Sequence, residues 1–194
     1  MMPRELVLAS SSSYRKALIA RLGLDCRAVA PEIDERALDR ESAIETVTRL
    51  AQAKARKIAA IAPGALIIGS DQVAVLGHTV LGKPGSHDAA ARQLRAMSGQ
   101  SVLFHTALCL LDAMSGEVQI ATVPTTVQLR KLHADQIERY LQQDQPYDCA
   151  GSAKIEALGI ALVERVESDD PTALIGLPLI ALVSMLKHAG VVIP

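Results

Sequence analysis

Four consecutive serines begin at Ser10, between a short apolar run at 6–9 and a helical pattern that contains two basic residues. The apolar run predicts a strand, so the serines would form a polar loop leading into a helix. A helix start exposes unpaired N–H groups at the positive end of the helix dipole, and this geometry favours a bound phosphate. Ser12 would add a hydroxyl as Ser10 does, and Arg15 and Lys16 would add positive charge. An ordinary capped helix with solvated basic side chains would show the same pattern.

Three more charged residues stand at positions suited to chemistry. Lys54 falls on the apolar stripe of a predicted helix, where it either reaches along the core edge to water or points toward a charged ligand. Asp71 comes three residues after an apolar run that predicts a buried strand, and ligands of open α/β sheets collect at the carboxyl ends of strands. A two-residue turn at 77–78 would place Lys83 opposite Gln72, beside that aspartate. Taken alone, Asp71 would be an ordinary turn residue and Lys83 an ordinary surface lysine.

Two polar segments supply further acids and another cation. The loop after Pro31 carries three acids, Glu32, Asp34 and Glu35. Carboxylates of this kind, together with phosphates of a substrate, are typical ligands of Mg²⁺. The segment 149–156 adds Lys154 and Glu156 in a Gly/Ser context, although either segment alone would pass for a solvated surface loop.

Together these groups meet the needs of phosphoanhydride hydrolysis. Cations offset the charge of a triphosphate, acids hold a divalent metal, and a carboxylate activates water. The chain has no Walker loop, no G-x-G-x-x-G fingerprint and no G-x-S-x-G motif, and its five histidines show no ligand spacing. The residues therefore indicate metal-dependent hydrolysis of a phosphoanhydride.

The elements that must position these residues alternate between apolar runs and helical patterns, which predicts an α/β fold. Strands are expected at 6–9, 65–68, 73–76, 79–81, 102–111, 118–132 and 160–166. Helices are expected from the serine loop to Gly23, at 41–62, 86–99 and 135–141, and at the C-terminal end. The apolar stripe of the second helix would consist of Ile44, Val47, Ala51, Ile58 and Ile61.

Composition excludes several classes of protein. The 194 residues fit a single domain, 1–194, with a core of aliphatic residues because the chain has no Trp and one Phe. A net charge of -1 argues against a nucleic-acid polymer as partner. Three scattered cysteines favour neither a disulfide framework nor a zinc site. With no signal peptide visible and the longest apolar stretch, 173–186, interrupted and short for a membrane span, we expect a soluble cytoplasmic protein.

The motifs, in this order, resemble those of the Maf family of nucleotide pyrophosphatases along essentially the whole chain. They are Leu-Ala-Ser-Ser-Ser-Ser-Tyr-Arg-Lys at 8–16, Pro-Glu-Ile-Asp-Glu at 31–35, Ala-Gln-Ala-Lys-Ala at 51–55, Ile-Gly-Ser-Asp-Gln-Val at 68–73 and Gly-Lys-Pro at 82–84. The segment Gly-Leu-Pro-Leu at 176–179 is also similar to the family. The resemblance implies a mixed, elongated and curved sheet flanked by helices, two lobes with an active-site cleft between them, and a homodimer.

The activity implied by the resemblance is cleavage between the α and β phosphates, which yields a nucleoside monophosphate and pyrophosphate. Asp71 would be the general base and would bind Mg²⁺ or Mn²⁺ together with Glu32. The candidate phosphate-binding residues are Ser10, Ser12, Arg15, Lys16, Lys54, Lys83 and Lys154.

Three residues, Tyr14, Gln72 and Glu156, resemble the branch of the family that hydrolyses 7-methyl-GTP. A 7-methylguanine carries positive charge, which an aromatic face attracts, and a carboxylate can accept from its N1–H and amine edge. Ala153 and Leu158 stand where the family commonly has aromatics. Two alternatives remain open, a pyrophosphatase for other modified nucleotides and a nucleotide-binding regulator of cell division or septum formation.

Overall fold

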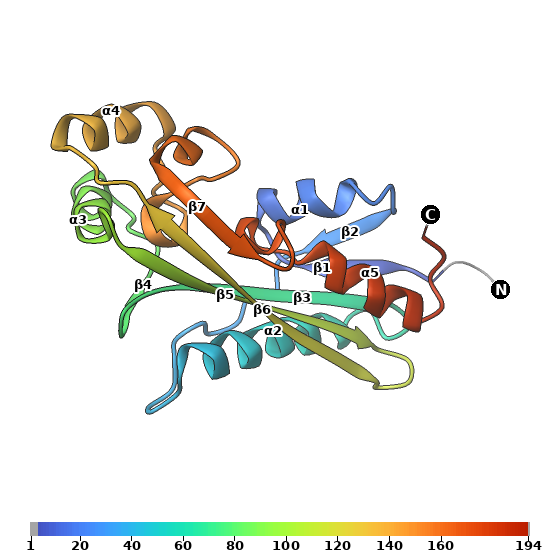
Figure 1. Ribbon diagram of the computed structural model, residues 1–194. Coiled ribbons are helices and arrows are strands. Elements are labelled where there is room, and N and C mark those ends of the chain that lie inside the picture. The colour runs from blue at the N-terminus through green and yellow to red at the C-terminus, as the bar shows by residue number, and fades with distance from the viewer. Residues whose placement is uncertain (1–3, 194) are drawn as a thin grey trace. The chain divides into compact units, whose positions relative to one another are not determined.

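The computed structural model describes residues 4–193, in which single strands and consecutive strand pairs are separated by helices along the chain (Figure 1). The strands are β1 (Leu6–Ala9), β2 (Cys26–Val29), β3 (Leu66–Leu76), β4 (Thr79–Leu81), β5 (Ser101–Asp112), β6 (Val118–Leu129) and β7 (Val163–Ser168). The α-helices are α1 (Ser13–Ala20), α2 (Ala43–Ala59), α3 (His87–Met97), α4 (Ala134–Asp144) and α5 (Leu179–His188). Short 3-10 helices are η1 (Ala150–Ser152), η2 (Leu158–Leu162) and η3 (Ala173–Ile175).

The strands form one mixed sheet in the order β2-β1-β3-β5-β6-β7, and β4 pairs with β3. β1 runs parallel to both β2 and β3, whereas β4 is antiparallel to β3 and β7 is antiparallel to β6. The predicted α/β class with a mixed sheet flanked by helices is therefore confirmed. No helix within residues 4–193 has both the length and the apolar character needed to cross a membrane.

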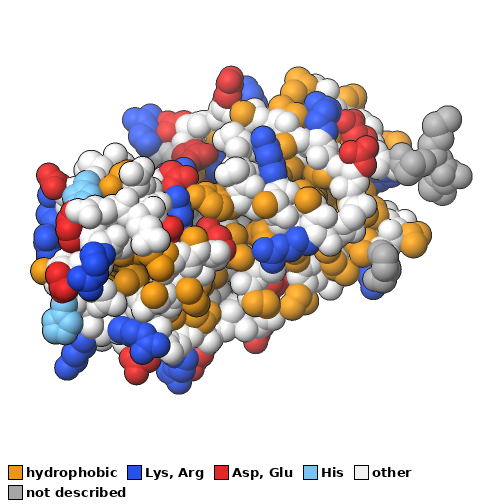
Figure 2. All heavy atoms as spheres, turned by 90° about the horizontal axis from the view of Figure 1, so that it is seen from above, with side chains coloured by type: hydrophobic (Ala, Val, Ile, Leu, Met, Phe, Trp, Pro, Cys, Tyr) orange, Lys and Arg blue, Asp and Glu red, His pale blue; other side chains and the backbone are white. Residues whose placement is uncertain are grey.

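The chain divides into two compact units. Among the described residues, unit 1 comprises 4–71, 106–123 and 170–193, and unit 2 comprises 72–105 and 124–169. The chain passes between the units four times, and three of these passages fall inside strands β3, β5 and β6. On the face shown in Figure 2, basic and acidic side chains are interspersed, in keeping with a net charge of -1.

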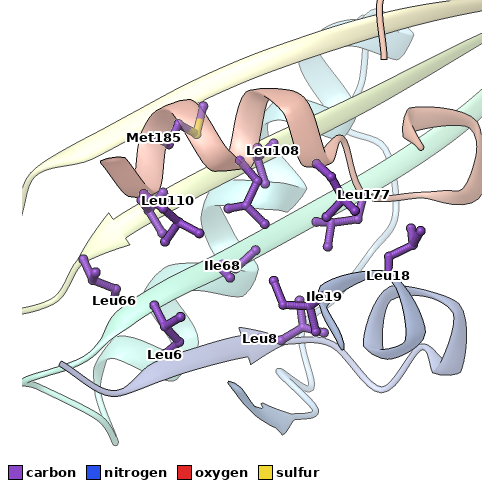
Figure 3. Packing of buried hydrophobic residues seen from close by; sticks show 13 residues of the cluster. Leu6, Leu8, Leu18, Ile19, Leu66, Ile68, Leu108, Leu110, Leu177 and Met185 are labelled. Carbon is purple, nitrogen blue, oxygen red and sulfur yellow. The ribbon is translucent and has the colours of Figure 1, made fainter. Parts of the chain in front are cut away.

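The core of unit 1 lies where α1 and α5 cover one face of β1, β3 and β5 (Figure 3). Leu6 and Leu8 of β1 and Leu66 and Ile68 of β3 point into it, because alternate residues of a strand face the same side. The parallel register pairs Leu8 with Ile68, so the two strands contribute in matched layers. Figure 3 shows the helix residues reaching the same space, among them Ile19 of α1.

The opposite face of β3 packs against α2. A capping box between Ser42 and Glu45 starts this helix sharply. Gly69 allows a close approach, since a Cβ built there would lie 2.1 Å from the carbonyl oxygen of Ala51. The predicted stripe is right in its middle, where Val47, Ala51 and Ile58 are buried. It is wrong at both ends: Ile44 is 47% exposed, and Ile61, 65% exposed, lies beyond the end of the helix.

Unit 2 contains the predicted hairpin of β3 and β4. Gly77 adopts a φ of +59° in the turn, and the register pairs Ala74 with Leu81. Helices α3 and α4 pack together in this unit. Phe104 of β5, the single phenylalanine, lies against Gly151, where a Cβ would be 3.5 Å from the ring atom Cζ.

Several predicted strands have different bounds in the structure, among them the one expected at 118–132, which ends at Leu129. The strand expected to end at Ile68 continues to Leu76, so the two runs at 65–68 and 73–76 form one strand. The strand expected from 160 begins at Val163 instead, and η2 precedes it. There the chain folds tightly on itself: a Cβ at Gly159 would lie 2.5 Å from the carbonyl oxygen of Lys154, so only glycine permits this approach.

Candidate active site

The serine loop of unit 1 connects the end of β1 to the start of α1. Ser12 caps the helix, since its hydroxyl accepts a hydrogen bond from the backbone N–H of Arg15 at 3.4 Å. The hydroxyl oxygen of Ser10, which is nearly buried, accepts from the backbone N–H of Ser12 at 3.1 Å. The predicted strand, polar loop and capped helix are confirmed.

Arg15 is held by two acceptors in the same unit. Its Nε donates to the carbonyl oxygen of Gly176 at 2.8 Å, and its Nη1 donates to the hydroxyl oxygen of Ser10 at 3.4 Å. Burial lowers the pKa of the Arg15 guanidinium, while the nearby carboxylates of Asp71 and Glu35 raise it. An arginine stays charged despite such opposing effects, so a fixed cation faces these two acids.

The carbonyl of Gly176 is itself fixed in place. The buried hydroxyl of Ser70 lies 2.9 Å from it, and Gly176 has a φ of +115°, which favours glycine. Asp170, 2% exposed, accepts from the N–H and hydroxyl of Thr172 and, at 2.7 Å, from the N–H of Ile180 at the start of α5. The loop before α5 is therefore tied down at both ends, and it orients Arg15.

Lys54 and Asp71 form an ion pair between α2 and β3. The Lys54 Nζ lies 2.6 Å from Asp71 Oδ1 and 2.8 Å from Glu35 Oε1. The Lys54 side chain is 6% exposed, so it does not reach past the core edge to water but points at these acids. Asp71 shares the α2-facing side of β3 with Gly69, as the alternation of a strand requires.

The expectation that Asp71 would end its strand is wrong, because β3 continues through it to Leu76. The neighbouring strand β1 stops at Ala9, however, and its paired residues end at Leu8 opposite Ile68. Asp71 thus lies just beyond the carboxyl end of β1, the strand that runs parallel to β3. Ligands of open α/β sheets collect at such strand ends, so Asp71 is still in a position to contact a ligand.

The three acids of the loop after Pro31 make different contacts. Glu35 contacts Lys54, whereas Asp34 pairs with Arg36, whose hydrogen bonds lower the pKa of Asp34 to about 2. Glu32 is exposed and has a φ of +41°, which is uncommon for a residue other than glycine. The described residues include no cluster of three or more His, Cys, Asp or Glu arranged to hold a metal. Asp71 and Glu35 both contact the ammonium of Lys54. Two carboxylates arranged in this way suit a divalent cation whose remaining ligands are phosphate oxygens.

The predicted site residues fall into two groups, one in each unit. Unit 1 contains Ser10, Ser12, Tyr14, Arg15, Lys16, Glu32, Lys54 and Asp71. Of these, Arg15 hydrogen-bonds to Ser10, and Lys54 forms an ion pair with Asp71. Tyr14 is half-buried and Lys16 is exposed.

Unit 2 contains Gln72, Lys83, Lys154 and Glu156. Lys83 is exposed and lies two residues past β4, whose pairing with β3 is observed only as far as Ala74 and Leu81, so the position of Lys83 opposite Gln72 stays a prediction. The Lys154 Nζ donates to the carbonyl oxygen of Asp144 at 3.2 Å and lies 3.7 Å from Asp148 Oδ1. Glu156 is exposed.

Several groups that hold these residues escaped sequence reasoning. The carbonyl of Gly176 orients Arg15, and Asp170 fixes the loop that carries that carbonyl. In unit 2, Gln93 hydrogen-bonds to Gly82 and to Ser152. A backbone carbonyl has no residue type to signal it, and a single glutamine on a helix matches no motif. For the carbonyl of Gly176, the one sequence signal was the Gly-Leu-Pro-Leu segment at 176–179.

The sequence is similar to those of known proteins along nearly its whole length. The family of Maf-like proteins matches residues 5–189. A protein of Nitrosococcus oceani named 7-methyl-GTP pyrophosphatase is 54% identical over 97% of this chain and 94% of its own length. Proteins of the same name from Thiobacillus denitrificans and Methylobacillus flagellatus are both 56% identical over 96% of this chain, covering 92% and 97% of their own lengths. Because the match spans nearly all of the sequence, the chain belongs to the Maf family.

Proposed function

We propose that this chain is a nucleoside triphosphate pyrophosphatase that hydrolyses 7-methyl-GTP to 7-methyl-GMP and diphosphate. The observation that carries the proposal is the cluster of Lys54, Asp71 and Glu35 in the same unit as the Arg15 loop. The names of the near full-length relatives support both the reaction and the substrate.

In this proposal Asp71 is the general base. Its carboxylate accepts a proton from a water molecule whose oxygen attacks the α phosphorus. The bond from that phosphorus to the bridging oxygen breaks, and diphosphate leaves with the electron pair. A positioned carboxylate of this kind contributes about 10²- to 10⁴-fold to a rate. Lys54, 2.6 Å from Asp71, holds the carboxylate in one orientation and adds positive charge beside the phosphates.

The serine loop would bind phosphate in the same unit. The start of α1 offers backbone N–H groups, and Arg15 offers the outer nitrogens of a guanidinium whose Nε is already occupied by Gly176. Lys16, exposed one residue further along, adds charge at the surface. The roles of Lys83 and Lys154 in phosphate binding stay predictions.

A divalent cation would offset phosphate charge during the reaction, and Mg²⁺ or Mn²⁺ has the preference for oxygen ligands that this site suits. The cation would be held by Asp71 and Glu35, which both contact the Lys54 ammonium. Glu32, from the same loop as Glu35, would be a further ligand. We expect activity to depend on one of these ions.

Selection of the base would rest on Tyr14, Gln72 and Glu156. The half-buried Tyr14 would attract the positively charged 7-methylguanine ring, and the exposed Glu156 carboxylate would accept from its N–H groups. Ala153 and Leu158 leave this segment without aromatics, so Tyr14 would supply the aromatic contact to the base.

A substrate panel tests the proposal. The purified chain is given 7-methyl-GTP, GTP, UTP and TTP with Mg²⁺, and diphosphate release is measured. The expected result is the highest kcat/KM for 7-methyl-GTP. A preference for GTP, UTP or TTP would show that 7-methyl-GTP is not the favoured substrate, weak turnover of all four would favour a pyrophosphatase for other modified nucleotides, and binding without turnover of any would favour the regulator of cell division. The cytoplasmic location and the homodimer also remain predictions, the second of which sedimentation can decide.

A further inference from the structure

Gln93 on α3 uses both ends of its side-chain amide to connect two segments of unit 2. Its Nε2 donates to the carbonyl oxygen of Gly82 at 3.0 Å, and its Oε1 accepts from the hydroxyl of Ser152 at 2.6 Å. A backbone carbonyl can only accept, so the amide nitrogen must face Gly82 and the amide oxygen must face the serine hydroxyl. The orientation of the side chain is therefore determined by its two partners.

The Ser152 end of this connection lies in strained backbone. Ser152 is fully buried with a φ of +56°, directly after Gly151 with a φ of +71°. Glycine adopts this conformation freely, but a serine does so only where its surroundings hold it. The hydrogen bond to Gln93 is the restraint on its side chain, and the segment it fixes continues to Lys154 and Glu156.

The Gly82 end of the connection carries Lys83, the next residue. This short segment is held again at Gly85, whose backbone N–H donates to the carbonyl oxygen of Tyr147 at 3.0 Å. Gly85 has a φ of +69°, so the chain turns between these two restraints. The exposed Lys83 side chain thus extends from backbone that Gln93 anchors on one side.

We propose that Gln93 is a positioning residue that couples the backbone of Lys83 to the segment Gly151–Glu156. One side chain would then align a phosphate-binding lysine with the residues that select the base. The inference rests on the proposed function for the roles of Lys83 and Glu156, whereas the coupling itself is a property of unit 2.

Two substitutions break the two hydrogen bonds separately. In Gln93→Glu the carboxylate still accepts from Ser152 but cannot donate to Gly82, so we expect KM to rise about three- to tenfold for all four nucleotides with little change in kcat. In Ser152→Ala the bond to Gly82 remains, so we expect the ratio of kcat/KM for 7-methyl-GTP over GTP to fall about threefold or more. In the double variant, the two effects should not be additive.

Hydrogen exchange measures the coupling between the two segments in the absence of substrate. In Ser152→Ala we expect faster amide exchange not only at residue 152 but also, through Gln93, at Gly85, whose N–H donates to the carbonyl oxygen of Tyr147. Gln143→Glu, the same chemical change at an exposed position on α4, is the matched control and should behave as the unsubstituted chain. Should Gln93→Glu fail to fold, the single-oxygen deletion in Ser152→Ala still decides the question.

The outcomes separate the two proposals. If the unsubstituted chain hydrolyses none of the nucleotides but exchange at Gly85 responds to Ser152→Ala, the proposed function fails and the coupling stands. Unchanged exchange at Gly85 in Ser152→Ala would overturn the coupling, and so would additive kinetic effects in the double variant.

Discussion

The Lys54 ammonium lies 2.6 Å from the Asp71 carboxylate, although the two residues come from different elements, α2 and β3. Their distance is set by how closely the helix packs on the strand. Gly69, two residues before the aspartate on the same side of β3, makes that packing possible because any Cβ would collide with Ala51. A glycine with no chemical role therefore determines where the proposed base meets its cation.

Asp71→Asn should abolish most of the activity. The amide cannot accept the proton of the attacking water, so we expect kcat to fall about 10²- to 10⁴-fold. Lys54 keeps its contact with Glu35, so the fold should persist. Diphosphate release measures the loss, with Asp25→Asn, an exposed acid in the same unit, as control. Full activity in Asp71→Asn would remove Asp71 from the role of base.

Gly69→Ala should destabilise the protein through overpacking between α2 and β3. The added methyl would lie 2.1 Å from the Ala51 carbonyl oxygen, so the helix must move, at a cost of about 1–3 kcal/mol. Urea unfolding measures the difference. Gly64→Ala is the matched control, since a Cβ there meets nothing within 4 Å and should change stability by less than about 1 kcal/mol. Equal stability of the two variants would contradict the packing explanation.

Arg15→Lys should weaken substrate binding even though the charge is kept. A lysine lacks the planar fork that lets arginine bond to Gly176 through Nε and to phosphate through its outer nitrogens. We expect KM for 7-methyl-GTP to rise about tenfold, measured by steady-state kinetics. Arg21→Lys, at an exposed position just after α1, should leave KM unchanged. A KM that is equally unaffected in Arg15→Lys would show that the guanidinium does not bind the substrate.

Chelation of divalent cations should abolish hydrolysis, and added Mg²⁺ or Mn²⁺ should restore it. Removing one carboxylate ligand weakens the hold on the ion, so Glu35→Gln should raise the Mg²⁺ concentration that gives half-maximal activity by about tenfold. Glu32→Gln tests the other candidate in the same way. Activity that persists in excess chelator would exclude the predicted metal dependence.

The ion pair between Arg4 and Asp112 should make stability depend on acid pH. The guanidinium donates to the carboxylate at 2.6 Å and holds the pKa of Asp112 well below its usual value. A lowered folded-state pKa contributes stability above the unfolded pKa of about 3.9, and this contribution is lost as the pH falls toward the folded value. In Arg4→Met, the drop in Tm between pH 5 and pH 3 should therefore be smaller. Arg27→Met, which removes an exposed pair with Glu5, should retain the full drop.

Sequence patterns predicted unit 1 well where local physics dominates. The serine loop, its cap and the helix after it follow from residues adjacent in the chain. Lys54 could be identified from the sequence because a lysine is unusual on an apolar stripe. Its ion pair with Asp71 accounts for that position. The prediction failed at the ends of that stripe, where Ile44 is exposed and Ile61 lies past the end of α2, because the helical period alone does not reveal how much of a helix is covered.

Features that depend on distant segments could not be predicted. Whether β3 stops at Ile68 or continues to Leu76 depends on its partners, since the polar residues between the two apolar runs look like a loop. The bond from Arg15 to the Gly176 carbonyl joins residues 161 positions apart. Gln93 gains its role only when the fold brings Gly82 and Ser152 to the same helix face.

Because the chain passes between the units four times, no uninterrupted stretch of the gene encodes one unit without part of the other, and three of these passages fall inside strands. Truncated clones would thus yield fragments with broken strands rather than working halves. The contributions of the two units are better separated by paired point substitutions in the intact chain. A tag or reporter inserted within the chain belongs at the Ser115-Gly116 turn, where the backbone is exposed and no strand is cut.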